Sequence, residues 1–316
     1  MEVPSEARPE WADSLVEVAK KLRALRMRFS IHAQQATRLS GYQGSALRGV
    51  LGHALRRAHC LSVHDQPCKA DDCVYRAFFE PKASGGEGQL ASWADVPRPF
   101  VIEAPVEGCC ELLGGEGFSF DVLVFGTASE RSQVVIDAMV DGLSRGLGPD
   151  RVAFSAECEW TRAETVELSG HSVGADVSLD FPLPLRLQQE GHLTTDLQPE
   201  IVVRALLERI SALVRVWQGE SVTLPFRQIV DQASELQVKR SRTQLLRMSR
   251  LSGRQRKRIP LDGMVGNLVW GGGAVLDALW PLLRAGQLVH VGKGCVFGLG
   301  RMMAADAVEQ LQELNR

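Results

Sequence analysis

The sequence predicts an α+β protein built from two tandem ferredoxin-like domains (split βαβ, RRM-like). Two observations predict this fold class. A length of 316 residues suits two domains of ordinary size. In addition, apolar residues switch between a period of two and helical spacing, and this gives the order strand, helix, strand, strand, helix, strand in each half. We therefore expect an N-terminal domain over residues 1–172 and a C-terminal domain over residues 173–316.

The first half contains the pattern in its more regular form. Trp11, Leu15 and Ala19 recur at helical spacing, and a plausible N-cap at Ser129 begins a later helix. The expected elements are a helix over 11–24, a strand over 27–36, a helix over 47–58, strands over 99–104 and 118–125, a helix over 129–145, and strand-like segments over 151–160 and 165–168.

The second half repeats the order of elements without repeating the sequence. Asp196 caps a long amphipathic helix, in which Pro199 is tolerated because it lies in the first turn. The expected elements are a strand over 180–187, a helix over 196–217, a hairpin formed by a basic segment and residues 259–270, a helix over 275–283, and a strand over 287–291.

The composition is that of a globular protein, with 45% hydrophobic and 23% charged residues. No apolar run approaches the roughly 18 residues that a membrane-spanning helix needs, and the first residues are polar and acidic. We therefore expect a cytoplasmic protein with no membrane partner.

Positive charge is concentrated in one segment. Nine Lys and Arg residues, and no Asp or Glu, lie between Lys239 and Arg258, whereas the whole chain has a net charge of −2. Such asymmetry predicts a polyanionic partner. A solvated linker is the alternative, but the interleaved Leu245, Leu246 and Met248 are unusual for a linker.

A glycine-rich loop follows near the C-terminus. Gly292, Gly294, Gly298 and Gly300 lie within nine residues, with Lys293 inside the loop and Arg301 after it. Glycine allows close backbone approach and positive φ, and successive N–H groups can form an anion-binding concavity. The alternative is a tight hairpin that closes a sheet.

These segments resemble the RAMP superfamily, and most closely the CRISPR precursor-RNA processing endoribonucleases. The resemblance rests on the loop from His290 to Arg301, on the stretch from Arg250 to Gly266, and on Leu47-Arg48-Gly49 with the residues up to Pro81.

The resemblance implies an endoribonuclease that recognises sequence and structure and cleaves CRISPR repeat RNA in the precursor transcript to give mature guide RNAs. It implies metal-independent attack by a ribose 2′-OH, which leaves a 2′,3′-cyclic phosphate and a 5′-OH, without a cofactor. The alternative is a non-catalytic RAMP subunit that binds guide RNA in a CRISPR effector complex. Repeat or guide RNA is the expected partner, and other effector-complex subunits are further expected partners.

The basic segment and the glycine-rich loop are the expected RNA-binding residues, because cations neutralise phosphates. We expect arginines two apart on a strand, such as Arg250, Arg254, Arg256 and Arg258, to form one row. The expected RNA-binding residues are Lys239, Arg240, Arg242, Arg247, Arg250, Arg254, Arg256, Lys257, Arg258, Gly292, Lys293, Gly294, Gly298, Gly300 and Arg301.

Histidine suits proton transfer near neutral pH. Related enzymes place such a residue near the end of the first long helix, which makes His59, His64 and His53 the candidates. For His53 the alternative is core packing. For His290, in the expected strand before the loop, we favour a structural bond to backbone.

A metal site is the competing interpretation of the region after the first long helix. Cys60, Cys68 and Cys73, with His59 or His64, have the residue types of a Cys₃His zinc site. The set is one cysteine short of a Cys₄ site, so we expect no metal. A zinc-stabilised protein-interaction module remains the second alternative function.

Overall fold

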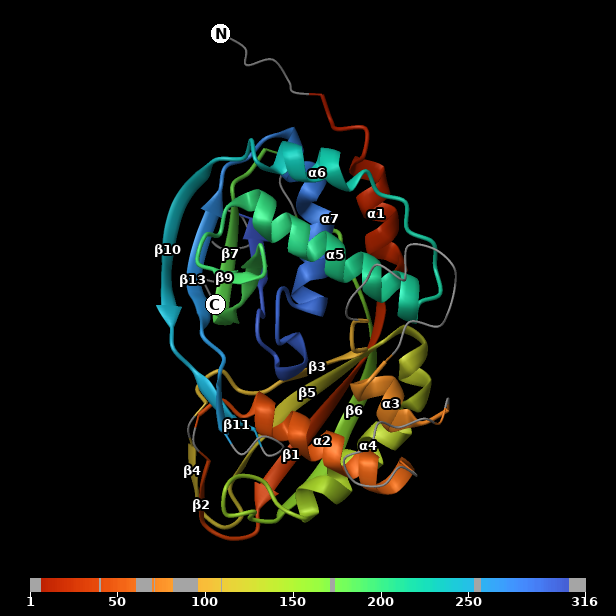
Figure 1. Ribbon diagram of the computed structural model, residues 1–316, viewed down its shortest axis with the longest axis vertical. Helices are drawn as coiled ribbons and strands as arrows, with labels where there is room; N and C mark the ends of the chain where they lie inside the picture. Colours follow the sequence, from red (N-terminus) through yellow and green to blue (C-terminus); the bar gives the residue numbers. More distant parts are fainter. Residues whose placement is uncertain are drawn as a thin grey trace. The chain divides into compact units, whose positions relative to one another are not determined.

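The computed structural model describes residues 7–39, 41–60, 70, 72–81, 96–108, 110–170, 174–252 and 257–306 (Figure 1). The chain divides into two compact units. Unit 1 contains Met1–Leu22, Thr165–Arg215 and Gly219–Arg316, and unit 2 contains Arg23–Glu164 and Val216–Gln218. The first helix, α1 (Ala12–Lys21), packs on the C-terminal helix α7 (Ala274–Val289), which explains its place in unit 1.

Unit 2 is built on a four-stranded antiparallel sheet of order β3-β5-β1-β6. In the central pair, Ala24 lies opposite Phe125 and His32 lies opposite Gly117. The strands are β1 (Arg23–Ala33), β3 (Phe100–Glu103), β5 (Gly117–Phe125) and β6 (Phe154–Thr165), and the two long helices are α2 (Gly44–His59) and α4 (Ser132–Ser144). This strand order with two helices between the strands is ferredoxin-like.

The core of unit 2 follows from strand alternation and from close helix packing. Met27, Phe29 and Ile31 on β1 are completely buried, and Phe29 stacks on Phe120 with ring centroids 5.2 Å apart. A short helix, α3 (Val74–Phe79), packs on α2 at Gly52, where a Cβ would lie 2.7 Å from the Phe79 ring. Smaller elements are β2 (Thr37–Leu39), β4 (Cys110–Leu112) and the 3₁₀ turn η2 (Gly126–Arg131).

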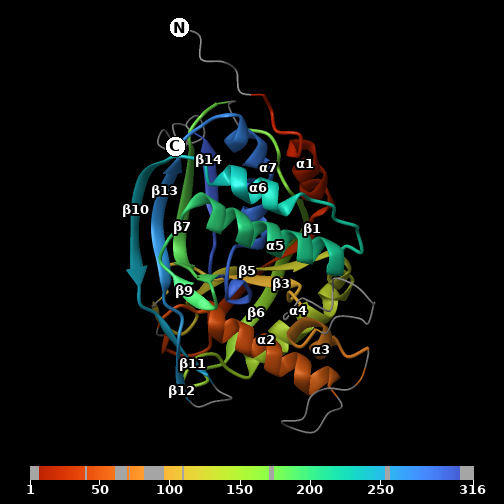
Figure 2. The ribbon, with the colours of Figure 1, turned by 45° about the horizontal axis from the view of Figure 1, so that its top comes forward.

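Unit 1 has the same sheet order, β10-β13-β7-β14. Its strands are β7 (Val177–Leu185), β10 (Val238–Leu246), β13 (Gly263–Trp270) and β14 (Met303–Asp306); its other elements are β8 (Leu187–Gln189), β9 (His192–Thr194), α5 (Pro199–Trp217), α6 (Phe226–Ala233), β11 (Ser249–Ser252), β12 (Lys257–Pro260) and η3 (Cys295–Phe297). Figure 2 shows α5 and α7 on the same side of this sheet. The prediction of tandem ferredoxin-like domains is therefore confirmed.

Two expected strands are wrong. Residues 287–289 are not a strand, because α7 continues to Val289 and the fourth strand, β14, follows the glycine-rich loop. Gly286 does not end the helix; it lets the Met302 side chain approach, since a Cβ there would collide with it. In unit 2, residues 151–160 and 165–168 do not form two strands, because β6 is one strand that ends at Thr165.

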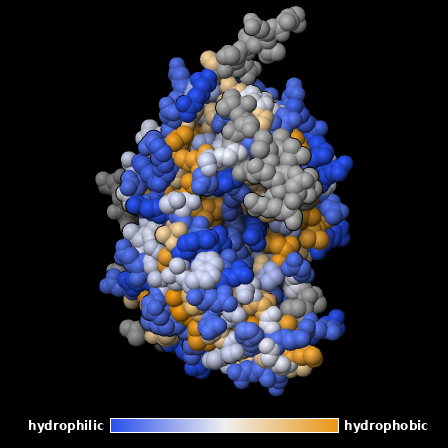
Figure 3. Space-filling model, turned by 180° about the vertical axis from the view of Figure 1, so that it is seen from behind, coloured by the Kyte–Doolittle hydropathy of each residue, from blue (hydrophilic) through white to orange (hydrophobic). Residues whose placement is uncertain are grey.

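The part of the chain that the structure describes contains no helix long and apolar enough to cross a membrane. On the face shown in Figure 3, hydrophobic residues are interspersed with hydrophilic ones.

Candidate nucleic-acid interface

A long antiparallel ribbon carries most of the expected RNA-binding cations. We define the basic ribbon as residues 238–252 and 257–270, which contain β10, β11, β12 and β13. One ladder runs from Val238 opposite Trp270 to Leu246 opposite Gly263, and a second continues from Ser249 opposite Pro260 to Ser252 opposite Lys257. The predicted hairpin is therefore confirmed, and the linker interpretation does not apply to these residues.

The cations of the basic ribbon differ in how much of their charge is free. Lys239 forms an ion pair with Asp176 at 2.7 Å, so its charge is largely neutralised. Arg240, Arg242 and Arg247 are exposed and make no ion pair with any described residue, and the same holds for Lys257 and Arg258. These five cations are the ones that a polyanion would meet unneutralised.

The expectation that Arg250 and Arg258 belong to one row is wrong. Arg250 lies opposite Ile259, whereas Arg258 lies opposite Leu251, one position out of step. Because neighbouring strand positions point to opposite faces, Arg250 and Arg258 project from opposite sides of the ribbon. Arg254 and Arg256 lie outside the described residues.

Arg250 connects the basic ribbon to the glycine-rich loop. Its guanidinium lies over the Phe297 ring, 5.1 Å from the centroid. Burial lowers the pKa of Arg250, and no described residue forms an ion pair with it. The contact is a cation–π interaction that fixes the loop against the ribbon.

The glycine-rich loop is a rigid structure held to the end of β7. Its four glycines all have positive φ. A Cβ at Gly292 would lie 2.6 Å from the carbonyl oxygen of Arg186, and a Cβ at Gly300 would collide with the carbonyl oxygen of Val291. Both positions therefore require glycine.

Several amides expected to form an anion cradle are already used within the fold. Lys293 N–H donates to the Arg186 carbonyl at 2.8 Å, and Gly300 N–H donates to the Pro184 carbonyl at 3.0 Å. Those of Val291, Phe297 and Gly298 also donate to backbone carbonyls. The exposed Lys293 ammonium is thus the clearest feature of the loop that suits an anion.

His290 holds the glycine-rich loop from inside. It is completely buried at the C-terminal end of α7, with φ of 60°. Its Nδ1 lies 3.1 Å from the Gly298 carbonyl oxygen and 3.3 Å from that of Leu299. Since carbonyls only accept, Nδ1 carries the proton, and the expected backbone-bonded role is confirmed.

The histidine candidates that the structure describes lie on α2 in unit 2. His53 and His59 are both exposed, so the core-packing alternative for His53 is wrong. They are six positions apart on the helix, which places them about 120° apart around the axis and about 9 Å apart along it. His64 lies outside the described residues.

Arginines of α2 make contacts that the sequence did not reveal. Arg48 lies over the Phe79 ring, 4.6 Å from its centroid, and Arg56 lies 5.5 Å from that of Tyr75. Burial, together with the nearby Glu80 carboxylate, raises the pKa of Tyr75. These contacts join α2 to α3, so the two arginines stabilise the helix that carries the histidines.

A metal centre is not formed by the described residues, among which no three His, Cys, Asp or Glu side chains gather. Cys60 and Cys73 are free thiols, and the Cys73 thiol donates to the His59 carbonyl at 3.5 Å. Cys68 lies outside the described ranges, so the complete set of three cysteines is not described.

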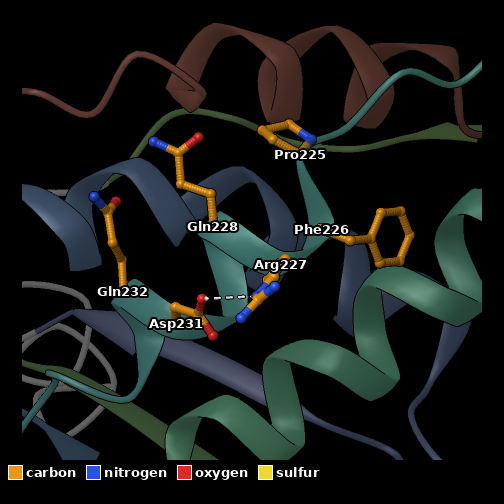
Figure 4. Close-up of a pocket in the computed structure, with 6 residues that line it drawn as sticks. All are labelled: Pro225, Phe226, Arg227, Gln228, Asp231 and Gln232. Atoms are coloured by element: carbon orange, nitrogen blue, oxygen red, sulfur yellow. Dashed lines mark ion pairs between the residues drawn. The ribbon is translucent and has the colours of Figure 1, made fainter.

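Two of the hollows formed by described residues lie on unit 1. The larger, of about 500 Å³, lies along α6 (Figure 4), where Arg227 forms an ion pair with Asp231 at 3.6 Å. Its charges therefore cancel, and it has no feature of a polyanion site. The smaller, of about 320 Å³, lies on the basic ribbon and includes Arg247, Arg258 and Asp262. Sequence reasoning missed Asp262 and Arg186, since neither belongs to a motif.

Comparison with known proteins assigns the two halves separately. Residues 179–302 match the family model of the CRISPR-associated endoribonuclease Cas6, and residues 22–173 match a model described as an N-terminal domain. No curated protein matches the chain in sequence.

Solved structures share the fold of nearly the whole chain. Thermus thermophilus Cas6 is 12% identical, with 90% of this chain and 98% of that chain covered and a TM-score of 0.54. A Cas6 product complex is 17% identical, with 89% and 99% covered and a TM-score of 0.50. A partial Cas6-RT-Cas1–Cas2 complex is 12% identical, with 91% of this chain and 46% of that chain covered and a TM-score of 0.55.

Because the solved structures are less than 25% identical to this chain, they establish its fold alone. The family model matches the sequence of the second half. The resemblance seen in the sequence is thereby confirmed: residues 179–302 match the model of the CRISPR-associated endoribonuclease Cas6 family, and the chain shares the fold of solved Cas6 proteins.

Proposed function

We propose that this protein cleaves CRISPR repeat RNA in a precursor transcript to give mature guide RNAs. The observation that carries the proposal is the match of residues 179–302 to the Cas6 family model. The same unit holds the basic ribbon, with its five exposed cations that form no ion pair with a described residue, and the glycine-rich loop that Arg250 joins to the ribbon. Relatives solved as Cas6 product complexes support it. In this proposal residues 173–316 grip the RNA and residues 1–172 supply the proton-transfer group.

The RNA lies along the basic ribbon through its phosphates. Arg240, Arg242 and Arg247 provide exposed guanidinium groups on β10 and just after it, and Lys257 and Arg258 continue the charge on β12. Contacts of this kind bind duplex RNA by shape and backbone, and each neutralised phosphate makes the affinity depend on salt. The glycine-rich loop adds Lys293 at a fixed position.

Cleavage proceeds without a metal ion. A base removes the proton of a ribose 2′-OH, the 2′-oxygen forms a bond to the adjacent phosphorus, and the bond from phosphorus to the 5′-oxygen breaks. An acid gives a proton to that leaving oxygen. The products are a 2′,3′-cyclic phosphate and a 5′-OH, and nearby cations stabilise the extra phosphoryl charge.

One histidine of the α2 region performs a proton transfer. His59 and His53 point in directions about 120° apart, so a single phosphate meets only one of them. His59 is the last residue of the helix, the position near which the related enzymes place such a histidine, and we therefore place the role there before His53. His64 remains the third candidate.

Incubation with end-labelled repeat RNA in EDTA tests the reaction. We expect one cut that leaves a cyclic phosphate and a 5′-OH, and no cut when the ribose before the cut lacks its 2′-OH. Cleavage that requires added metal would contradict the mechanism. RNA that is bound and never cut would instead identify a non-catalytic RAMP subunit.

A further inference from the structure

The smaller hollow lies where the basic ribbon changes from one ladder to the next. Arg247, Met248 and Ser249 form one side, and Arg258, Pro260 and Asp262 form the other, around a volume of about 320 Å³. The hollow is shallow and open to solvent, so a bound group would lie against it with one side exposed. The volume of the hollow is large enough for a group that projects from a bound chain.

Asp262 makes this hollow different from the rest of the basic ribbon. It is the single acidic residue between positions 238 and 270 of the sequence. Its Oδ1 accepts the Met248 N–H at 2.9 Å, and its backbone oxygen accepts Arg186 Nε–H at 3.0 Å. Its Oδ2 accepts no hydrogen bond from the residues that the structure describes, and the carboxylate interacts with the charge of Arg186 without forming an ion pair.

A fixed carboxylate is unsuited to phosphate, because the two anions repel. It is suited to a hydrogen-bond donor, since an ionised carboxylate only accepts. The two arginines around it provide planar cations on which a base stacks, or donors for base acceptors. The hollow thus has the chemistry of a nucleobase site within a phosphate-binding surface.

Guanine is the base that matches this chemistry most fully. Its Watson–Crick edge presents two neighbouring donors, N1–H and the N2 amino group, and its other edge presents the acceptors O6 and N7. Adenine, cytosine and uracil each offer a carboxylate one donor group on the Watson–Crick edge. Unpaired bases are the ones that expose this edge to protein.

We propose that the hollow at Asp262 holds an unpaired guanine of the RNA, with the Asp262 carboxylate accepting from guanine N1–H and N2–H. Arg247 and Arg258 flank the base, and Met248 and Pro260 contribute apolar surface. The inference rests on the proposed function, because it needs an RNA substrate. It adds a specificity-determining residue to that function.

The test uses hairpin RNAs with randomised single-stranded flanks, selected for binding to the full chain and then sequenced. We expect the natural protein to enrich guanine at one unpaired position, and Asp262→Asn to lose that enrichment while still binding hairpins. The amide of this variant can still accept the Met248 N–H, so the turn is preserved. Asp231→Asn on α6 is the matched control and should keep the enrichment.

A second measurement replaces the enriched guanine with inosine, which lacks the N2 amino group. We expect affinity for the natural protein to fall about ten-fold, and Asp262→Asn to bind both RNAs equally. Unchanged enrichment in Asp262→Asn, or no enriched base at all, would overturn the inference while RNA binding and cleavage stand. If the natural protein bound no hairpin RNA, the proposed function would fail as well.

Discussion

The two ferredoxin-like units use arginine in opposite ways. In unit 2, Arg26 on β1 forms ion pairs with Glu103 at 2.6 Å, Asp121 at 2.9 Å and Glu164 at 2.9 Å. In unit 1, Arg240 and Arg242 of the basic ribbon are exposed and pair with no described acid. Because both sheets have the same strand order, the fold alone does not determine which surface meets a polyanion. The pairing of charges does.

The difference also separates an arginine that stabilises the fold from arginines that are available to bind a phosphate. Burial opposes the charged form of Arg26, yet the carboxylates of Glu103 and Asp121 raise its pKa above its usual value. A phosphate would have to displace these carboxylates, and breaking a buried pair is costly. Arg26 is thus not available to RNA phosphates, and we expect unit 2 to contribute chemistry through α2.

The largest effect is expected from removing the proton-transfer histidine. His59→Ala should lower the single-turnover cleavage rate by about 10²–10⁴-fold, because general acid–base catalysis contributes that much. RNA affinity should change little, since binding is assigned to unit 1. Gel separation of cleaved RNA and a filter-binding titration measure the two quantities.

His53→Ala and His64→Ala are the matched controls for this variant. Exactly one of the three should lose cleavage. Equal and small losses in all three would mean that the α2 region supplies no proton-transfer group, and the division of roles between the units would be wrong.

The next effect is on stability. Arg26→Met should lower the free energy of unfolding by about 3–5 kcal/mol, because it leaves buried carboxylates without their cation. Arg240→Met, on the exposed basic ribbon, should change it by about 0.5 kcal/mol or less. Urea unfolding of both variants measures the two changes in the free energy of unfolding. Equal changes would contradict the claim that the ion pairs of Arg26 stabilise the fold whereas Arg240 does not.

The order of elements could be predicted from the sequence, because strand alternation and helical spacing are local patterns. The strand expected over residues 287–291 failed because a short apolar run has no period that separates a strand from the end of a buried helix. Gly286 added to the error. It reads as a helix stop, whereas it serves a close approach by Met302.

The sequence was enough to predict the positive charge of the candidate site, but not the faces of the ribbon from which its arginines project. Nine cations in one segment are visible in the sequence, whereas the faces from which Arg250 and Arg258 project depend on strand register. The carboxylates around Arg26 are far apart in the sequence and meet only through pairing of β1, β3, β5 and β6. Long-range pairing of this kind leaves no local pattern.

A smaller effect concerns salt. Replacing Arg240, Arg242 and Arg247 together by Gln should reduce the slope of log affinity against log salt by about 1 for each lost phosphate contact. Titrations of a repeat hairpin at several salt concentrations give the slope. Arg227→Gln on α6, where the arginine is already paired with Asp231, should leave it unchanged. An unaltered slope in the triple variant would show that the RNA does not bind along the basic ribbon.

The smallest expected effect is on the pH dependence of stability, and it compares a paired with an unpaired aspartate within unit 1. Burial raises the pKa of Asp180, which makes no ion pair with a described residue, whereas the Lys239 hydrogen bond lowers the pKa of Asp176. A raised pKa means that stability is lost as pH rises through the folded value. A lowered pKa means that stability is lost as pH falls through it.

The two Asn variants should therefore differ in sign. Asp180→Asn should raise the melting temperature at pH 7, and the gain should vanish below pH 3.8, the ordinary value for aspartate. Asp176→Asn should lower it slightly at pH 7, because its pair with Lys239 is exposed and worth little. Melting curves from pH 3 to pH 8 compare them. The same sign in both would mean that an unpaired carboxylate costs this unit nothing, and the argument from charge pairing would lose its support in unit 1.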